Sequence, residues 1–348
     1  MFQVSHHANL GHALARRAFS EPPTENYNLP SWAPIVGFVD FLVFFPVFLI
    51  IGYTLGSIFP TLAIVEDPNP PAYEPVALDE GAADQGPAAP IPSKPITASL
   101  RATQRLLSGV AGWRSYFRGI ACAFVLGIAE ATLGDIFKKF LPLIPIGALL
   151  AQLALTQLGA AWTHIVISSP SDRRFYRRLP PFKKTFEATC FPILSVWLAN
   201  TITILVPTLI GKALGIPLPG HPQEDPKLGA GDLWKPTVMG LVAIALQLLA
   251  VVPANVLLVR VQASLLPPDE DTIVPFDRSF QGKVEPAIVG GKGFVSMRDA
   301  LATFPTASWV RLYKLYAKIL GVTIAAYGIL LAVVVPEIIL IISKSTKA

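Results

Sequence analysis

Six stretches of apolar residues, each long enough or nearly long enough to cross a lipid bilayer, dominate this sequence. They cover approximately residues 34–65, 119–137, 141–167, 186–214, 236–259 and 319–342. A helix needs about 20 apolar residues to span the hydrocarbon core. The second stretch is the weakest, because Glu130 and Asp135 interrupt it. The pattern predicts an all-α integral membrane protein with six transmembrane helices.

The overall composition supports a membrane protein and argues against a nucleic-acid-binding one. Charged residues make up 15% of the chain and hydrophobic residues 52%, whereas soluble domains carry about 25% charged residues. The formal net charge is +5, but the basic residues lie mostly in the connections between apolar stretches and form no recognised nucleic-acid-binding module. We therefore expect the lipid bilayer, and no nucleic acid, as a partner.

Lysine and arginine are unequally divided between the two sides that six spans would define. The connections 66–118, 168–185 and 260–318 together hold 19 of the 28 basic residues. Basic loops mark one side of a membrane, so both termini are predicted to lie on the opposite side. The connection after the third span carries a cluster that fixes orientation or binds anionic lipid headgroups. Its members are Arg173, Arg174, Arg177, Arg178, Lys183 and Lys184.

The segments outside the spans differ in character. Residues 1–33 form a tail whose first twenty residues contain no acid, which fits either a mitochondrial presequence or a disordered end. Residues 66–95 are rich in proline, alanine and acids, as disordered linkers are. Residues 96–117 place apolar and arginine residues at helical spacing. This predicts an amphipathic helix, lying on the membrane surface or packed on a neighbouring loop.

The spans recur in pairs. The odd spans are followed or closed by Pro60, Pro170 and Pro253, and the even spans begin after an aromatic and basic segment. This recurrence predicts three tandem two-helix repeats, a common arrangement in transporters. Repeat one covers 34–139, repeat two 140–215 and repeat three 216–343, followed by a short tail at 344–348.

With these features the chain resembles the mitochondrial carrier family. The matching positions are a proline with a following acid, a later Arg-x-Gln, and an aromatic-Arg-Gly entry to an even helix. They are Pro60, Pro170, Asp172, Pro253, Asn255, Arg260, Gln262, Arg118 and Gly119. The resemblance implies a six-helix bundle in a mitochondrial membrane. It does not distinguish the inner membrane from the outer one.

The chain departs from that family where the resemblance implies charges. The acidic position is occupied by Leu62, Asp172 and Asn255, and the basic position by Val65, Phe175 and Leu258. In working carriers these six positions are implied to pair as a ring that closes one side. The connection after the third span is also too short for the usual surface helix. We therefore expect a diverged member that performs no conventional exchange cycle.

Candidate functional groups within the spans are few, because burying an ionisable group in lipid is costly. Glu130 lies in the middle of a span, whereas Asp40 and Glu337 lie near span ends. The candidates for a cavity or substrate site are Glu130, His164, Gln157, Asn200 and Gln247. The amides serve equally as hydrogen bonds between helices.

No catalytic or metal-binding pattern accompanies these residues. The sequence contains no glycine-rich phosphate loop, nucleophile elbow or metal-spaced His and Cys set. Its two cysteines, Cys122 and Cys190, both fall in apolar stretches. We therefore expect that the protein is not an enzyme and that it binds no metal and no cofactor. Two functions remain: transport of a small solute without conventional exchange, or a non-transporting adaptor that organises the membrane or assists protein insertion.

Overall fold

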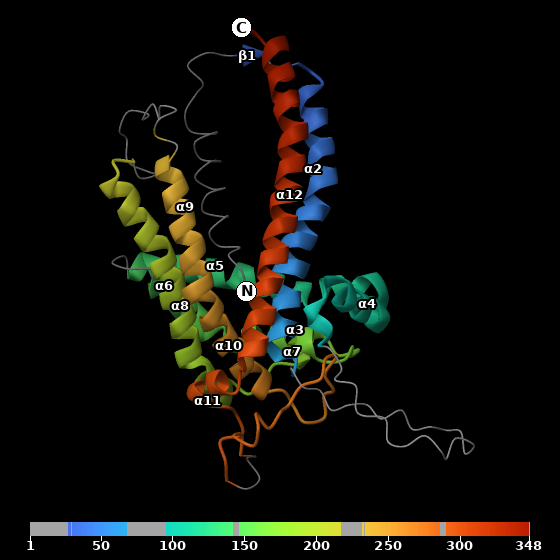
Figure 1. Cartoon of the computed structure of the whole chain (residues 1–348), viewed down its shortest axis with the longest axis vertical. Coiled ribbons are helices and arrows are strands. Elements are labelled where there is room, and N and C mark those ends of the chain that lie inside the picture. The colour runs from blue at the N-terminus through green and yellow to red at the C-terminus, as the bar shows by residue number, and fades with distance from the viewer. Residues whose placement is uncertain are drawn as a thin grey trace, which may run out of the picture. The chain divides into compact units, whose positions relative to one another are not determined.

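The structure is a computed structural model that describes residues 27–28, 30–67, 95–141, 146–216, 232, 234–285 and 290–347. Within these ranges the chain is helical apart from loops, one two-stranded ladder and one isolated bridge (Figure 1). Five helices are long and apolar enough to cross a membrane, or six if one bent pair counts as a single span. The prediction of a multi-pass helical membrane protein is confirmed at this level.

The helices follow the predicted apolar stretches. The first span comprises α2 (Ala33–Leu49), the π-helical η1 (Ile50–Ile58) and α3 (Phe59–Val65), and the second is α5 (Ile120–Phe140). The third is α6 (Ile146–Ala154) with α7 (Thr156–Ile167), and the fourth is α8 (Phe182–Ala213). The fifth comprises α9 (Trp234–Leu246), the π-helical η6 (Gln247–Val251) and α10 (Val252–Ser264), and the sixth is α12 (Thr306–Lys344).

Short elements occupy the connections that are rich in basic residues. They are η2 (Ile96–Ala98), α4 (Leu100–Ala111), η3 (Gly112–Phe117), η4 (Phe175–Arg177) and α11 (Met297–Ala302). The connection after the third span holds only the single turn η4, so it is indeed too short for a surface helix. The predicted linker falls almost entirely, and the N-terminal tail largely, outside the described residues.

The chain divides into two compact units. Unit one consists of Met1–Ala63, Lys94–Arg118 and Ala307–Ala348, and unit two of Ile64–Ser93 and Gly119–Thr306. In unit one, α2 and α12 run antiparallel, with the rings of Phe48 and Tyr327 4.7 Å apart. The ladder of β1 (Tyr27–Asn28) with β2 (Thr346–Lys347) joins their outer ends (Figure 1).

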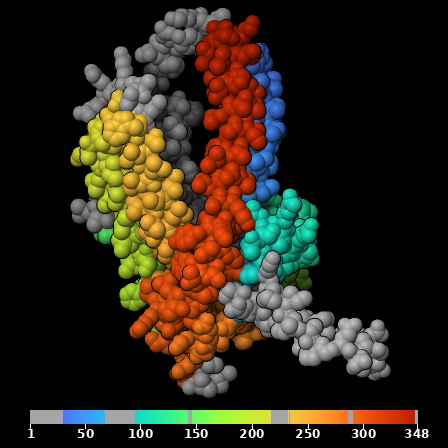
Figure 2. All heavy atoms as spheres, in the orientation of Figure 1, coloured from blue at the N-terminus to red at the C-terminus, as the bar shows by residue number. Residues whose placement is uncertain are grey.

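The outer halves of α2 and α12 expose large apolar side chains along their length. Figure 2 shows the two helices as adjacent columns, α2 in blue and α12 in red. Examples are Phe38, 61% exposed, on α2 and Ile339, 62% exposed, on α12. Apolar side chains that point outward from a long helix are those that lipid would cover.

In unit one, side chains of η1 and α12 donate hydrogen bonds to backbone carbonyls of η3 and α3. Thr54 Oγ1 donates to the carbonyl of Tyr116 at 2.8 Å, and Arg311 Nη2 donates to that of Ala63 at 3.1 Å. On α4, Leu107 is fully buried within the unit, whereas Trp113, in the η3 turn that follows, is 69% exposed. Because Leu107 is buried against protein, the amphipathic helix fits the prediction that it packs on neighbouring segments better than the prediction that its apolar face lies in lipid.

Unit two contains the second to fifth spans. Gly147 of α6 packs directly on α5, since a Cβ added there would lie 2.8 Å from the carbonyl oxygen of Gly134. Helices α6 and α7 meet at a bend of 63° around Leu155. Helix α8 packs on α9 and α10, with Ala188, Leu257 and Val261 in a common apolar cluster that also includes α11.

Prolines do not end the first and fifth spans, contrary to the sequence interpretation. The helix continues past Pro60 to Val65, and past Pro253 to Ser264. Only Pro170 follows the end of its helix, α7. A proline ring clashes with the carbonyl four residues earlier in a regular helix. The π-helical segments η1 and η6 end two residues before Pro60 and Pro253, and their wider turns make room for the ring.

Candidate functional site

Buried polar side chains gather in unit two where α7 and α10 end. Thr163, His164 and Ser168 come from the end of α7, and Arg260 and Gln262 from α10. Each is at most 7% exposed, and polar groups at that depth require hydrogen-bond partners. The partners that they find connect these helices to the loops that follow them.

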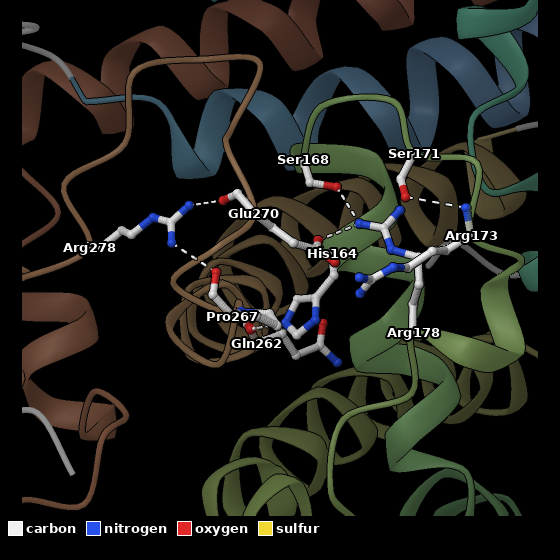
Figure 3. Close-up of polar contacts among 9 residues, drawn as sticks. All are labelled: His164, Ser168, Ser171, Arg173, Arg178, Gln262, Pro267, Glu270 and Arg278. Atoms are coloured by element: carbon white, nitrogen blue, oxygen red, sulfur yellow. Dashed lines mark hydrogen bonds and ion pairs between the residues drawn. The ribbon is translucent and has the colours of Figure 1, made fainter. Parts of the chain in front are cut away.

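Gln262 is the centre of the contact between the two helices. Thr163 Oγ1 donates to Gln262 Oε1 at 2.6 Å. His164 Nε2 lies 2.8 Å from the carbonyl oxygen of Gln262 (Figure 3). A Cβ added at Gly159 would lie 3.4 Å from Gln262 Nε2, so the α7 backbone passes close to this amide. His164 is therefore a contact between helices, and its imidazole is buried rather than facing a cavity.

Arg178 connects the two loops beyond these helices. It donates to Ser168 Oγ at 2.6 Å and forms an ion pair with Glu270 (Figure 3). The side chains of Arg178 and Glu270 are 5% and 18% exposed. Arg278 in turn donates to the backbone carbonyls of Pro267, at 2.9 Å, and Glu270. Charge-assisted hydrogen bonds are stronger than hydrogen bonds between neutral groups, so these arginines connect the two loops firmly.

This geometry corrects the predicted role of one basic residue. Arg178 turns inward to Glu270, so it is not available to lipid headgroups. The rest of the predicted cluster keeps its basic groups at the surface. Arg173, Arg174, Arg177 and Lys183 are exposed, and Lys184 is half-buried.

Arg260 joins α10 to α11 and to the end of the first span. Its Nε donates to the carbonyl of Ala300 at 2.8 Å, and its Nη2 to Thr303 Oγ1 at 2.8 Å. The guanidinium carbon lies 4.8 Å from the ring centroid of Phe280 and 5.2 Å from that of Phe304. The hydrogen bonds and aromatic faces compensate for removing this charge from water.

Beside Arg260, Asp277 organises a turn with unusual backbone angles. Its carboxylate accepts hydrogen bonds from the N–H groups of Ser279, at 2.9 Å, and Gln281, at 2.7 Å, and from the Ser279 hydroxyl. Phe280 and Gln281 have φ of 50° and 59°, a region that residues with a side chain seldom adopt. The turn places the Phe280 ring against Arg260.

The charge of Asp277 is favoured by these contacts. Burial opposes ionisation of the carboxyl. The hydrogen bonds from Ser279 and from the backbone of Gln281, together with the Arg260 charge, outweigh burial and lower the pKa of Asp277. A pocket of about 40 Å³ lies between these residues and Glu66, Asp67 and Thr303. It is about the size that one water molecule needs.

The carrier-like positions form no ionic ring in the described residues. Leu62 and Val65 are buried apolar residues. Asp172 is exposed, and Asn255 Nδ2 donates to the carbonyl of Val251 in its own span at 3.0 Å. Phe175 packs edge-on against its neighbour Tyr176.

The two residues at the entry to the second span have structural roles. The carbonyl of Arg118 accepts a hydrogen bond from the Tyr53 hydroxyl within unit one. Gly119 caps α5 with φ of 69°, and a Cβ there would lie 3.2 Å from Trp162 Cδ1. Glycine has no Cβ, so it accommodates both the positive φ and the close approach of Trp162.

The remaining cavity candidates are distributed along unit two. Gln157 Nε2 donates to the carbonyl of Pro180 at 2.7 Å, which links α7 to the entry of α8. Asn200 of α8 and Gln247 of η6 are half-buried. Glu130 of α5 is also half-buried and has no hydrogen bond or ion pair with any described residue. Within the described ranges, no three His, Cys, Asp or Glu residues are placed to hold a metal ion.

Sequence reasoning identified Arg260, Gln262 and His164, but not Thr163, which binds Gln262, nor Phe280 and Thr303, which contact Arg260. Glu270, Asp277, Phe280 and Thr303 lie in the long connection before the sixth span, which has no periodicity. No known family model, curated protein or solved structure matches this chain.

Proposed function

We propose that this chain is a diverged carrier-like protein of a mitochondrial membrane that serves as a membrane adaptor or organiser and performs no conventional exchange. The observation that carries the proposal is the hydrogen-bonded contact of α7 with α10 at Gln262. A transport cycle needs an end that opens and closes. A contact of buried, mostly uncharged hydrogen bonds suits a permanent closure better than a switch.

The surrounding loops support the same proposal. The ion pair of Arg178 with Glu270 joins segments 92 residues apart. Arg260 joins α10 to the backbone of Ala300 and Ile64. A ligand changes a conformational equilibrium only through its different affinities for the two states. Opening this end would break all of these contacts at once, which is a large cost for a small solute to offset.

The exposed basic residues of the third connection suit an anchoring role at the bilayer surface. Arg173, Arg174 and Arg177 lie on η4 or directly before it, close to the exposed ring of Tyr176. Basic side chains at a membrane surface attract anionic headgroups by about 1 kcal/mol each. We propose this surface as the contact with anionic lipid.

Reconstitution into liposomes tests the proposed function. We expect counter-exchange of charged metabolites no faster than in protein-free liposomes, because a ring of paired charges is missing. Robust exchange that is lost in Asp172→Asn, and kept in the matched surface variant Asp269→Asn, would restore a carrier cycle and reject the proposal.

Glu130 favours transport of a small solute as the second candidate. Its carboxyl has no described partner, and an acid within a span often marks a solute or proton pathway. In that case Glu130→Gln changes uptake while membrane insertion is unaffected. Labelling of Glu130→Cys by a water-soluble thiol reagent, with Cys122 and Cys190 replaced, tests for a water-filled path to this position.

A further inference from the structure

One face of α4 gathers two arginines and two hydrogen-bonding side chains around an open hollow. Arg101, Gln104, Arg105 and Ser108 are spaced three and four residues apart, so they share a face of the helix. All four are exposed, and they line a hollow of about 400 Å³, within the size range of pockets that hold small molecules. The buried Leu107 lies on another side of α4, against the rest of unit one.

The positive charge of this face is not neutralised by the described part of the chain. Arg101 and Arg105 form no hydrogen bond or ion pair with any described residue. Residues 95–118 contain four arginines and no acid. Ser108 Oγ and Tyr116 Oη lie 2.8 Å apart, which holds a hydroxyl group at the edge of the hollow. The face is therefore complementary to an anion.

A contact with α12 places the start of α4 at the end of a lipid-facing surface. Lys318 Nζ donates to the carbonyl of Ala98, two residues before α4, at 3.0 Å. Lys318 is two residues before Leu320, where a run of exposed large apolar side chains begins that continues to Ile342. At 1.5 Å per residue this run covers about 33 Å, close to the thickness of the hydrocarbon core. Helix α4 therefore begins where the lipid-facing run of α12 ends.

The first span places the end of α4 at the same level. Thr54 Oγ1 donates to the carbonyl of Tyr116, in the turn that follows α4. Ile50, the last exposed large apolar residue of that span, is four residues before Thr54. Trp113 of the same turn is 69% exposed, and tryptophan is enriched at the level of lipid headgroups. Figure 2 shows this segment, in teal, projecting sideways beside α2.

We propose that the α4 face of Arg101 and Arg105 binds the headgroup of an anionic lipid whose phosphate is a monoester, such as phosphatidic acid. A phosphomonoester carries about 1.5 to 2 negative charges at neutral pH, which matches two guanidinium groups, whereas a phosphodiester carries one. A guanidinium group can form two parallel hydrogen bonds with a phosphate. Gln104 and Ser108 supply neutral donors beside them.

The level of α4 favours a lipid over a soluble phosphate compound. A headgroup bound there leaves its acyl chains against the exposed apolar side chains that end at Ile50 and Leu320. This inference requires only that the outer half of unit one lies in a membrane. It does not depend on the proposed adaptor role, because a chain that performed exchange could bind the same lipid.

Calorimetric titration of the full chain in uncharged detergent with dioctanoyl phosphatidic acid tests the site. We expect the double variant Arg101→Gln with Arg105→Gln to bind this lipid about thirtyfold more weakly, since two charges near a membrane surface are lost. The matched control Arg173→Gln with Arg174→Gln removes two exposed arginines elsewhere and should keep the wild-type affinity. An equal loss in both double variants, or no loss in the α4 variant, would overturn the proposal.

A comparison of ligands on wild-type protein needs no variant. Dioctanoyl phosphatidic acid should bind at least about fivefold more tightly than dioctanoyl phosphatidylglycerol, a diester with one charge fewer. Glycerol 3-phosphate, the same monoester without acyl chains, should bind far more weakly. Equal affinity for the two lipids would reduce the site to general attraction of anions and reject it. Equally tight binding of glycerol 3-phosphate would show that the ligand is a soluble phosphate compound and would reject the lipid site.

Discussion

At the residue scale, Asp277 shows how one side chain stabilises a backbone that its neighbours disfavour. Phe280 and Gln281 both have positive φ, which costs a residue with a side chain about 1–2 kcal/mol. Three hydrogen bonds to the Asp277 carboxylate offset this cost. The result is a Phe280 ring positioned on the buried Arg260.

Asp277→Ala should therefore destabilise unit two by about 1–3 kcal/mol, through the lost hydrogen bonds to a charged group. Thermal unfolding in detergent measures this change. Asp269→Ala is the matched control, because it removes an exposed acid of the same connection. Equal midpoints for the two variants would show that the Asp277 contacts contribute nothing.

The stability that Asp277 contributes should depend on pH in a defined direction. The pKa of its carboxyl is lower in the folded protein than in the unfolded chain, so the unfolded chain binds the proton more readily. Its contribution is complete above the unfolded pKa of about 4 and is lost as the pH falls through the lower folded pKa. As the pH falls below about 4, wild type and Asp277→Asn should converge in unfolding midpoint. A constant difference would mean that the charge of Asp277 has no role.

The same residues show the limit of what the sequence predicts at this scale. Arg260 and Gln262 stood out because they match a motif. Their burial against Phe304 and Thr163 follows from contacts between segments 44 and 99 residues away. Local periodicity carries no information about such distant partners, so the site could only be half-predicted.

At the element scale, the spans were predictable and their irregularities were not. Apolar length alone located the five long apolar helices and the bent pair α6–α7, because a helix needs about 20 apolar residues to cross the lipid whatever its tertiary contacts. The π-helical turns before Pro60 and Pro253 and the 63° bend at Leu155 depend on packing as well as on sequence. The prolines predicted that the helices end there. The structure instead has a wider π-helical turn before each proline, and the helix continues beyond it.

The contact of α5 with α6 gives a prediction at this scale. A Cβ at Gly147 would lie 2.8 Å from the Gly134 carbonyl and 3.0 Å from the Lys138 nitrogen, both backbone atoms that cannot move alone. Gly147→Ala should lower stability by about 1–3 kcal/mol, as overpacked contacts do. The control Gly127→Ala, on the open side of α5, should be neutral or slightly stabilising, since no atom lies within 4 Å. A Gly147→Ala protein as stable as Gly127→Ala would contradict this close contact.

At the scale of the whole molecule, the account depends on the number and direction of the spans. In unit one, the ladder of β1 with β2 joins the segment before the first span to the segment after the last one. The unequal division of basic residues independently predicts that both ends lie on the side opposite the basic connections. The ladder and the division of basic residues both require the two ends to lie on one side, which needs an even number of crossings. Five long helices give an even number only if the bent pair α6–α7 counts as one full span.

Accessibility of single cysteines in intact membranes tests this arrangement most directly. In a background without Cys122 and Cys190, reporter cysteines at Ser345 and at the exposed Ser171, Asp269 and Ser279 are exposed to a membrane-impermeant thiol reagent before and after permeabilisation. Six spans predict that Ser345→Cys reacts from the side opposite to the other three, which share one side. Reaction of Ser171→Cys and Asp269→Cys from different sides, or of Ser345→Cys from the same side as Asp269→Cys, would contradict the six-span account.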